Sequence, residues 1–153
     1  TQGVSSAASD VYKRQDQFSG YWPKKATIWA GDGDDIIVGD HAAHKMYLGR
    51  GRDTVYFGYR AFATDEIAYD EYWCGATLMD YSNAEDNLRF PKSKNSYSIN
   101  YSNGGTDIKY RDCLIARLEG VSMQAVDDAI SSGRIAFDQP LYNIDNNLLR
   151  WVV

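Results

Sequence analysis

Large aliphatic residues recur at a fixed interval in the first part of the chain. Ile28, Ile37, Met46 and Val55 follow one another in steps of nine residues. A nine-residue step fits neither a helix nor a hairpin, and it is typical of a chain that coils in half-turns, each a tight glycine turn followed by a short strand. We therefore expect these four side chains to fill the interior between two layers of strands.

Two of the half-turns share a glycine-rich template. Residues Ala30–Val38 read AGDGDDIIV and residues Leu48–Tyr56 read LGRGRDTVY, so both follow x-G-x-G-x-D-x-U-x, where U is a large aliphatic residue. Glycine permits backbone angles that a side chain would forbid, which lets consecutive carbonyl oxygens turn toward one point. One isolated copy would indicate only an acidic turn, whereas two copies in phase favour a metal-binding repeat.

This stretch resembles the hemolysin-type calcium-binding repeats of RTX (repeats-in-toxin) proteins. The strong part of the resemblance covers residues 26–56, and a weaker part covers residues 78–130. The resemblance implies a C-terminal fragment of a secreted bacterial protein that is exported by type I secretion machinery. It also implies that calcium supports folding of the fragment outside the cell.

The resemblance implies one calcium ion between residues 30–35 and residues 48–53. The implied ligands are two carboxylates and four backbone carbonyl oxygens, from Asp35, Asp53, Ala30, Asp32, Gly49 and Gly51. Calcium takes ~6–8 oxygen ligands, and a site with only two carboxylates is expected to bind in the weak extracellular range of ~10⁻⁴–10⁻³ M. Asp32 and Arg50 occupy the variable slot and should face solvent, while Arg50 and Arg52 should weaken binding by a modest, salt-screened amount.

The alternate half-turns do not keep the template. Ala26 and His44 stand where the repeat has aspartate, so we expect no calcium on that side of the coil. The sequence Asp40-His41-x-x-His44 offers imidazoles that suit zinc or another transition metal. Surface histidines in a degenerate turn are the commoner explanation of this spacing.

Residues 1–15 are predicted not to be native. The eleven residues Ser5–Gln15 match the translation of a sequencing-library adaptor, and the chain begins with Thr1. The segment lacks the apolar core of a secretory signal peptide. We expect it to take no part in the fold, and we interpret the remainder as a gene fragment.

Composition narrows the classes of function. The chain has 153 residues and a formal net charge of −5, and an acidic protein is a poor partner for nucleic acid, which is bound mainly through Lys and Arg. It has no apolar run long enough to span a membrane. The two cysteines, Cys74 and Cys113, are compatible either with a disulfide outside the cell or with two buried thiols.

The remaining pattern completes an all-β prediction, with a short parallel β-roll followed by antiparallel strands and one short helix. Residues 57–77 are predicted to be a long loop or insertion. Asn103-Gly104-Gly105 predicts a hairpin turn, and Ser122 and Gly133 are placed to begin and end the helix. Strands are expected at Lys25–Trp29, Asn87–Phe90, Ser96–Tyr101, Asp107–Tyr110, Cys113–Leu118 and Arg134–Asp138.

The predicted organisation is a repeat region at residues 16–60 and a C-terminal β region at residues 61–153. The favoured function is a calcium-binding module of a secreted protein, without catalysis of its own, because no motif pairs a nucleophile with a base. Two alternatives stay open. One is the C-terminal part of a secreted hydrolase, and the other is a carbohydrate-binding or adhesion module that uses Tyr69, Tyr72 and Trp73.

Overall fold

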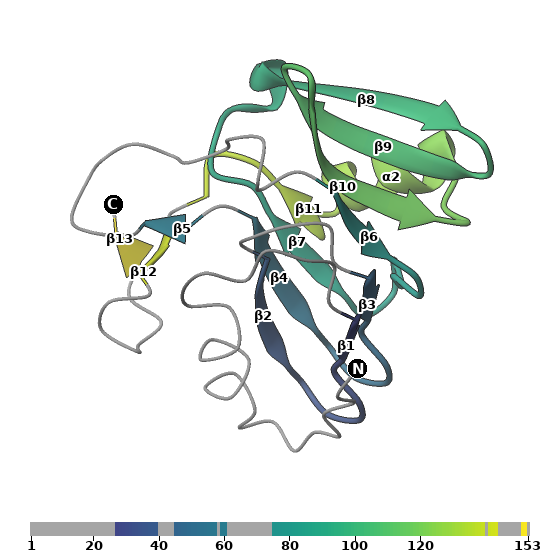
Figure 1. Cartoon of the computed structure of the whole chain (residues 1–153), viewed down its shortest axis with the longest axis vertical. Helices are drawn as coiled ribbons and strands as arrows, with labels where there is room; N and C mark the ends of the chain where they lie inside the picture. The colour runs from purple at the N-terminus through teal and green to yellow at the C-terminus, as the bar shows by residue number, and fades with distance from the viewer. Residues whose placement is uncertain are drawn as a thin grey trace.

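The computed structural model describes residues 27–39, 45–57, 59–60, 75–139, 141–143 and 151–152, and its strands form two main sheets (Figure 1). The first sheet runs in the order β1 (Thr27–Trp29), β3 (Lys45–Tyr47), β6 (Ala76–Leu78), β10 (Cys113–Glu119), β9 (Gly105–Tyr110) and β8 (Tyr97–Ser102). The second runs in the order β11 (Ile135–Ala136), β7 (Asn87–Arg89), β4 (Thr54–Phe57) and β2 (Ile36–Gly39). A small third sheet joins β13 (Trp151–Val152), β12 (Leu141–Asn143) and β5 (Tyr59–Arg60).

The chain passes from the first sheet to the second in four successive coils. The passages run from β1 to β2, from β3 to β4, from β6 to β7 and from β10 to β11. Each strand pairs in parallel with the strand of the next coil, β1 with β3, β3 with β6 and β6 with β10 in the first sheet. In the second sheet β2 pairs with β4, β4 with β7 and β7 with β11, again in parallel. The parallel stack therefore continues well beyond the nine-residue repeat.

Aliphatic side chains stack in two columns between the sheets. In the first sheet, Ile28 is paired with Met46 and Met46 with Leu78. In the second sheet the paired residues are, in order along the column, Ile37, Val55, Leu88 and Ile135. All seven are buried in one hydrophobic core, which confirms the prediction that the four repeat aliphatics point inward. Leu78 and Leu88 extend the columns with the same residue type, so the third coil is held by the same packing.

The prediction of an all-β chain, with a β-roll followed by a separate set of antiparallel strands, is wrong. The fold is mixed α/β: among the described residues, two main sheets of mostly parallel strands are joined by one α-helix, α2 (Met123–Ser131), and one short 3-10 helix, η1 (Lys94–Ser96). The antiparallel strands β8 and β9 belong to the first sheet, because β9 pairs with β10 and β10 pairs in parallel with β6. Alternation within the strands showed that they exist, but it carried no information about their partners.

Several local predictions for the second half of the chain are confirmed. Strands β7, β8, β9 and β10 lie where alternation placed them. The turn at Asn103 and Gly104, both with positive φ, joins β8 to β9. Helix α2 begins after Ser122, whose side chain accepts a hydrogen bond from the backbone of Ala125, and Gly133 follows its end with φ +80°. Helix α2 occupies the passage from β10 to β11, so a helix serves as the turn of the fourth coil.

Two further findings concern the cysteines and the helices. Cys113 is disulfide-bonded, and the only other cysteine in the sequence is Cys74, which lies outside the described residues. Among the described residues, no helix has the length and apolar character needed to cross a membrane.

Candidate metal centre

Two glycine-rich turns stack directly on each other, and we call residues 30–35 the first turn and residues 48–53 the second turn. Arg50 donates its backbone N–H to Gly31 O at 3.1 Å, and Gly33 donates to Arg50 O at 2.8 Å. Gly31 and Gly49 have φ of 94° and 92°, in the left-handed region. A Cβ added to Gly49 would collide with the carbonyl group of Gly31, so the approach of the two backbones requires glycine.

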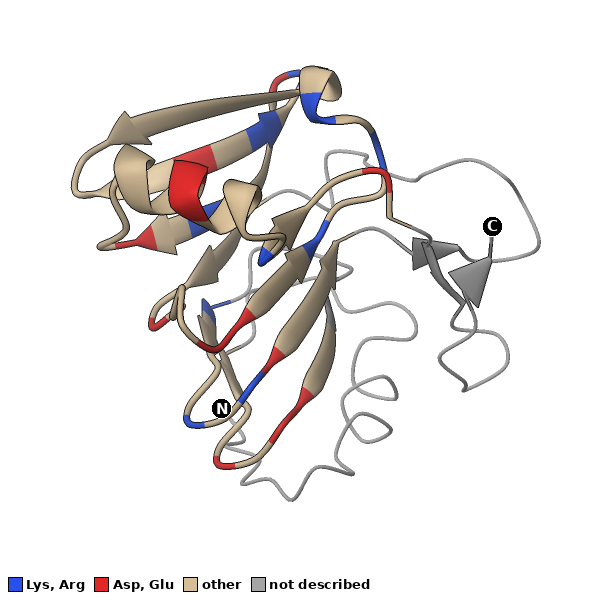
Figure 2. Cartoon of the chain, turned by 180° about the vertical axis from the view of Figure 1, so that it is seen from behind, with Lys and Arg blue, Asp and Glu red and all other residues tan. Residues whose placement is uncertain are grey.

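Three buried aspartates form a column at one end of the second sheet, each directly before one of the strands β2, β4 and β7. Asp35, Asp53 and Asp86 are 1%, 0% and 1% exposed. Asp35 donates its backbone N–H to Asp53 Oδ1 at 2.9 Å, and Asp53 donates its own to Asp86 Oδ1 at 3.2 Å. Figure 2 shows acidic segments of the ribbon at the corresponding ends of the three neighbouring strands. The carboxylate of each coil thus caps the backbone of the coil before it.

The second turn is held from both sides by carboxylates. Asp80, from the third coil, accepts the backbone N–H groups of Leu48 at 2.7 Å and Gly49 at 3.0 Å. Asp34, from the first turn, accepts the backbone N–H of Arg52 at 2.7 Å. These bonds connect residues in neighbouring coils, so they fix the register of the second turn against both of them.

The passage from β6 to β7, which we call the third turn (residues 79–86), contains no glycine. Asp86 Oδ2 accepts the backbone N–H of Ser82 at 2.8 Å. The guanidinium of Arg134 donates to Ala84 O at 2.9 Å and to Glu85 O at 3.0 Å. A cation supplied by the chain itself therefore binds the carbonyl oxygens of this turn.

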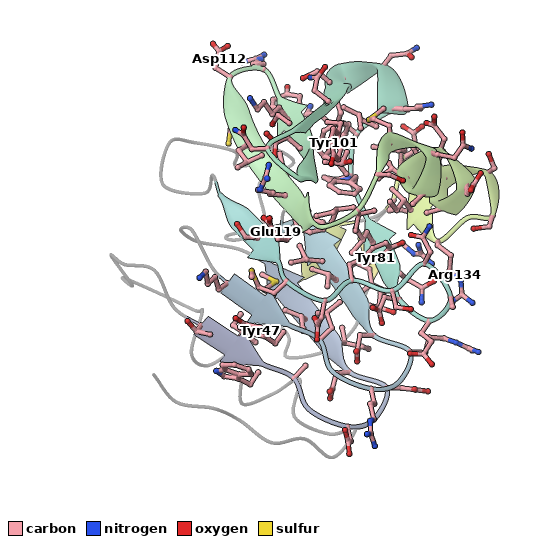
Figure 3. The ribbon with its side chains drawn as sticks, turned by 90° about the vertical axis from the view of Figure 1, so that its right-hand side faces the viewer. Tyr47, Tyr81, Tyr101, Asp112, Glu119 and Arg134 are labelled. Atoms are coloured by element: carbon pink, nitrogen blue, oxygen red, sulfur yellow. The ribbon has the colours of Figure 1, made fainter. Side chains whose placement is uncertain are left out.

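Burial dominates the electrostatics of the third turn. It raises the pKa of Asp86, although the N–H bonds from Ser82 and Asp53 act in the opposite direction. Burial also raises the pKa of Tyr81 above its ordinary range, with Asp86 adding to the effect and Arg134 opposing it. The Tyr81 hydroxyl is buried and has no hydrogen-bond partner among the described residues. Figure 3 labels Tyr81 and Arg134, which lie on the side of the molecule that carries α2.

The structure brings the two predicted carboxylate ligands together. The hydrogen bond between Asp35 and Asp53 places them in adjacent coils of one column. Of the residues predicted to offer carbonyl oxygens, Ala30 is buried, Asp32 and Gly49 are exposed, and Gly51 is half-buried. Asp32 is also paired in parallel with Arg50, which is exposed as the sequence predicted.

Carboxylate and carbonyl oxygens are the ligand types that calcium prefers, but the carboxylates alone are too few to hold the ion. Within the described ranges, no group of three or more His, Cys, Asp or Glu residues is placed to hold a metal ion. A calcium ion at Asp35 and Asp53 would need backbone carbonyls and water for its remaining ligands, as calcium sites commonly have. An aspartate that accepts one N–H keeps further lone pairs, because its two oxygens offer about four acceptor positions.

Asp34, Asp80 and Asp86 were not among the site residues predicted from the sequence. Asp86 carried a usable sign, because Asp-x-aliphatic occurs at Asp86-Asn87-Leu88 as it does in both glycine turns. Asp80 carried no such sign in the sequence, because its hydrogen-bond partners Leu48 and Gly49 lie 32 and 31 residues earlier in the chain. His41 and His44 of the alternative zinc site lie outside the described residues, as do Ala26 and residues 1–15.

Comparison with known proteins leaves this geometry as the main guide to function. No protein-family model matches the chain, and no curated protein matches it either. The resemblance to RTX repeats therefore rests on the sequence pattern alone, strongly over residues 26–56 and weakly over residues 78–130.

Proposed function

We propose that the first and second turns bind a calcium ion, and that the chain is a calcium-stabilised module of a secreted bacterial protein. The observation that carries this proposal is the burial of Asp35 and Asp53 side by side where two glycine turns stack. Its ligands would be the two carboxylates with carbonyl oxygens of Ala30, Asp32, Gly49 and Gly51. The bound ion would supply positive charge to a place where the fold concentrates negative charge.

The charge balance of the first and second turns supports a divalent cation. These two turns together contain four acidic residues and two basic ones, Arg50 and Arg52. Buried carboxylates are costly unless they are hydrogen-bonded and neutralised. The backbone N–H groups provide hydrogen bonds without providing a full charge, so a cation between the turns would relieve the repulsion that remains.

One observation supports a location outside the cell. Cys113 is disulfide-bonded, and disulfides persist mainly in oxidising compartments. The weak calcium affinity that we expect for this site would also suit the high calcium concentration of extracellular fluid. Export by type I machinery is the part of the proposal that rests on the resemblance alone. The aromatic residues of the carbohydrate-binding alternative, Tyr69, Tyr72 and Trp73, lie outside the described residues, and no observation favours hydrolysis.

Titration calorimetry of calcium into wild type and Asp53→Asn tests the proposal. Asparagine keeps an oxygen that can accept the N–H of Asp35, so this variant removes the charge and preserves the hydrogen bond. We expect wild type to bind with a Kd of ~10⁻⁴–10⁻³ M and the variant to show no calcium heat. Asp86→Asn, the matched control, makes the same change one coil further along and should keep binding. Equal calcium heats in wild type and Asp53→Asn would contradict the proposed site.

A further inference from the structure

The variable positions of the two glycine turns carry opposite charges. The first turn places Asp32 and Asp34 there, and the second turn places Arg50 and Arg52 at the equivalent positions. All four residues are exposed. The template leaves these slots open to any residue, so the arrangement is a property of this chain.

The stacking of the turns sets these charges against one another. Asp32 and Arg50 are direct partners in a parallel bridge, and neighbouring parallel strands lie about 4.8 Å apart with paired side chains on the same face. Asp34 Oδ1 accepts the backbone N–H of Arg52 at 2.7 Å and lies where a side chain on Gly51 would meet it. The two acidic residues at the variable positions of the first turn, Asp32 and Asp34, therefore each lie beside an arginine position of the second turn.

We propose that Arg50 and Arg52 are built-in counter-cations that let the first two turns stack without calcium and that lower the affinity of the site for calcium. The part that concerns affinity rests on the proposed calcium site, whereas the part that concerns stacking does not. In this protein the side chains of one coil do part of the charge neutralisation that a metal ion would otherwise do. Calcium then adds stability to a structure that is already formed.

The expected effects on melting temperature and on calcium affinity are large enough to measure, although all four residues are exposed. Opposite charges on neighbouring exposed positions contribute little individually, and two such attractions would correspond to a melting shift of about 2–6 °C in a chain of this size. Two positive charges within a Debye length of a divalent ion reduce its binding by about threefold to tenfold. Both effects should fade at high ionic strength.

The experiment compares three versions of the whole 153-residue chain: wild type, Arg50→Gln/Arg52→Gln, and the control Lys94→Gln/Arg111→Gln. The control removes the same charge from exposed residues that flank β8 and β9, in the part of Figure 1 away from the glycine turns. Melting temperatures are measured in EGTA, in EGTA with about 1 M sodium chloride, where the Debye length is about 3 Å, and in millimolar calcium. Calcium affinity is measured by calorimetry on the same three proteins.

We expect all three proteins to be folded in EGTA, with the arginine variant melting about 2–6 °C below the other two at low salt. The difference should shrink in high salt, and the variant should bind calcium about threefold to tenfold more tightly than wild type. The inference is overturned if the arginine variant melts with wild type in EGTA, if the control loses as much, or if wild type is unfolded without calcium. If calcium binds none of the proteins, the proposed site fails, while the EGTA and salt measurements still decide whether the charges pair.

Discussion

The glycine turns and the third turn solve the same geometric problem with different chemistry. Both connect the first sheet to the second and both place a buried aspartate before an inward-facing aliphatic residue. The glycine turns achieve this by stacking backbone directly on backbone. The third turn uses side chains, with Asp80 and Asp86 accepting N–H groups from the second turn and Arg134 donating to its own carbonyls. The carbonyl oxygens of the third turn bind a cation from a distant part of the chain, Arg134, whereas the only basic residues of the glycine turns, Arg50 and Arg52, lie within the turns themselves.

Substitution of a glycine in the stacked turns should have the largest effect on stability. Gly49→Ala should cost roughly 3–5 kcal/mol, because it combines an unfavourable left-handed φ with a clash against the backbone of Gly31. Gly120→Ala is the matched control, since Gly120 has φ +73° and open space around its Cα, and it should cost about 1–2 kcal/mol. Urea unfolding of both variants measures the difference. Equal losses would mean that the backbone contact between the turns contributes nothing.

Removing a carboxylate that connects the second and third turns should have the next largest effect. Asp80→Ala leaves the N–H groups of Leu48 and Gly49 without their acceptor and should cost about 1–3 kcal/mol. Asp112→Ala removes an exposed aspartate from the β9–β10 hairpin and should change stability by less than about 0.5 kcal/mol. Hydrogen exchange in Asp80→Ala should quicken at Leu48 and Gly49. Unchanged exchange at those amides would show that the carboxylate does not hold the second turn.

The smallest expected effect is a gain in stability within the third turn. Tyr81→Phe should stabilise the protein by about 1 kcal/mol, because it removes a buried hydroxyl that has no partner among the described residues. Burial raises the folded-state pKa of Tyr81 above the unfolded value of about 10. Below pH ~10 Tyr81 is neutral in both states and the stability does not depend on its ionisation, whereas at higher pH the unfolded state ionises first and the stability of wild type falls until the folded-state pKa is passed.

Thermal melts of wild type and Tyr81→Phe between neutral pH and pH ~11 measure both effects. The advantage of the variant should be constant below pH ~10 and should grow above it. A variant less stable than wild type at neutral pH would show that the hydroxyl has a favourable partner in solution.

The features predicted correctly from the sequence are those that follow from short repeating patterns of residues. The nine-residue step identified the buried aliphatics from Ile28 to Val55, and alternation identified the strands from β7 to β10. Ser122 marked the start of α2 because a helix N-cap is a local interaction. Of the candidate site, the juxtaposition of Asp35 and Asp53 followed from the same step.

The prediction missed contacts between distant parts of the chain. Ala76–Leu78 pairs with β3 in parallel across residues 58–75, and nothing within that short strand names its partner. Asp80 lacks any repeat context, and Arg134 was predicted only as the start of a strand. The all-β prediction failed for the same reason, since it treated a local change of pattern after Tyr56 as the end of the parallel stack.

The long segment between β7 and β11 shows where a chain of this fold can accept inserted residues. These two strands are neighbours in one sheet, and Leu88 pairs with Ile135, yet β8, β9, β10 and α2 all lie between them in the sequence. Closing a longer loop costs little, about 0.6 kcal/mol for each doubling of its length. A segment inserted between two neighbouring strands therefore need not change how those strands pair. The hairpin of β8 and β9 is such a segment, because it lies between β7 and β10 in the sequence and at one end of the first sheet.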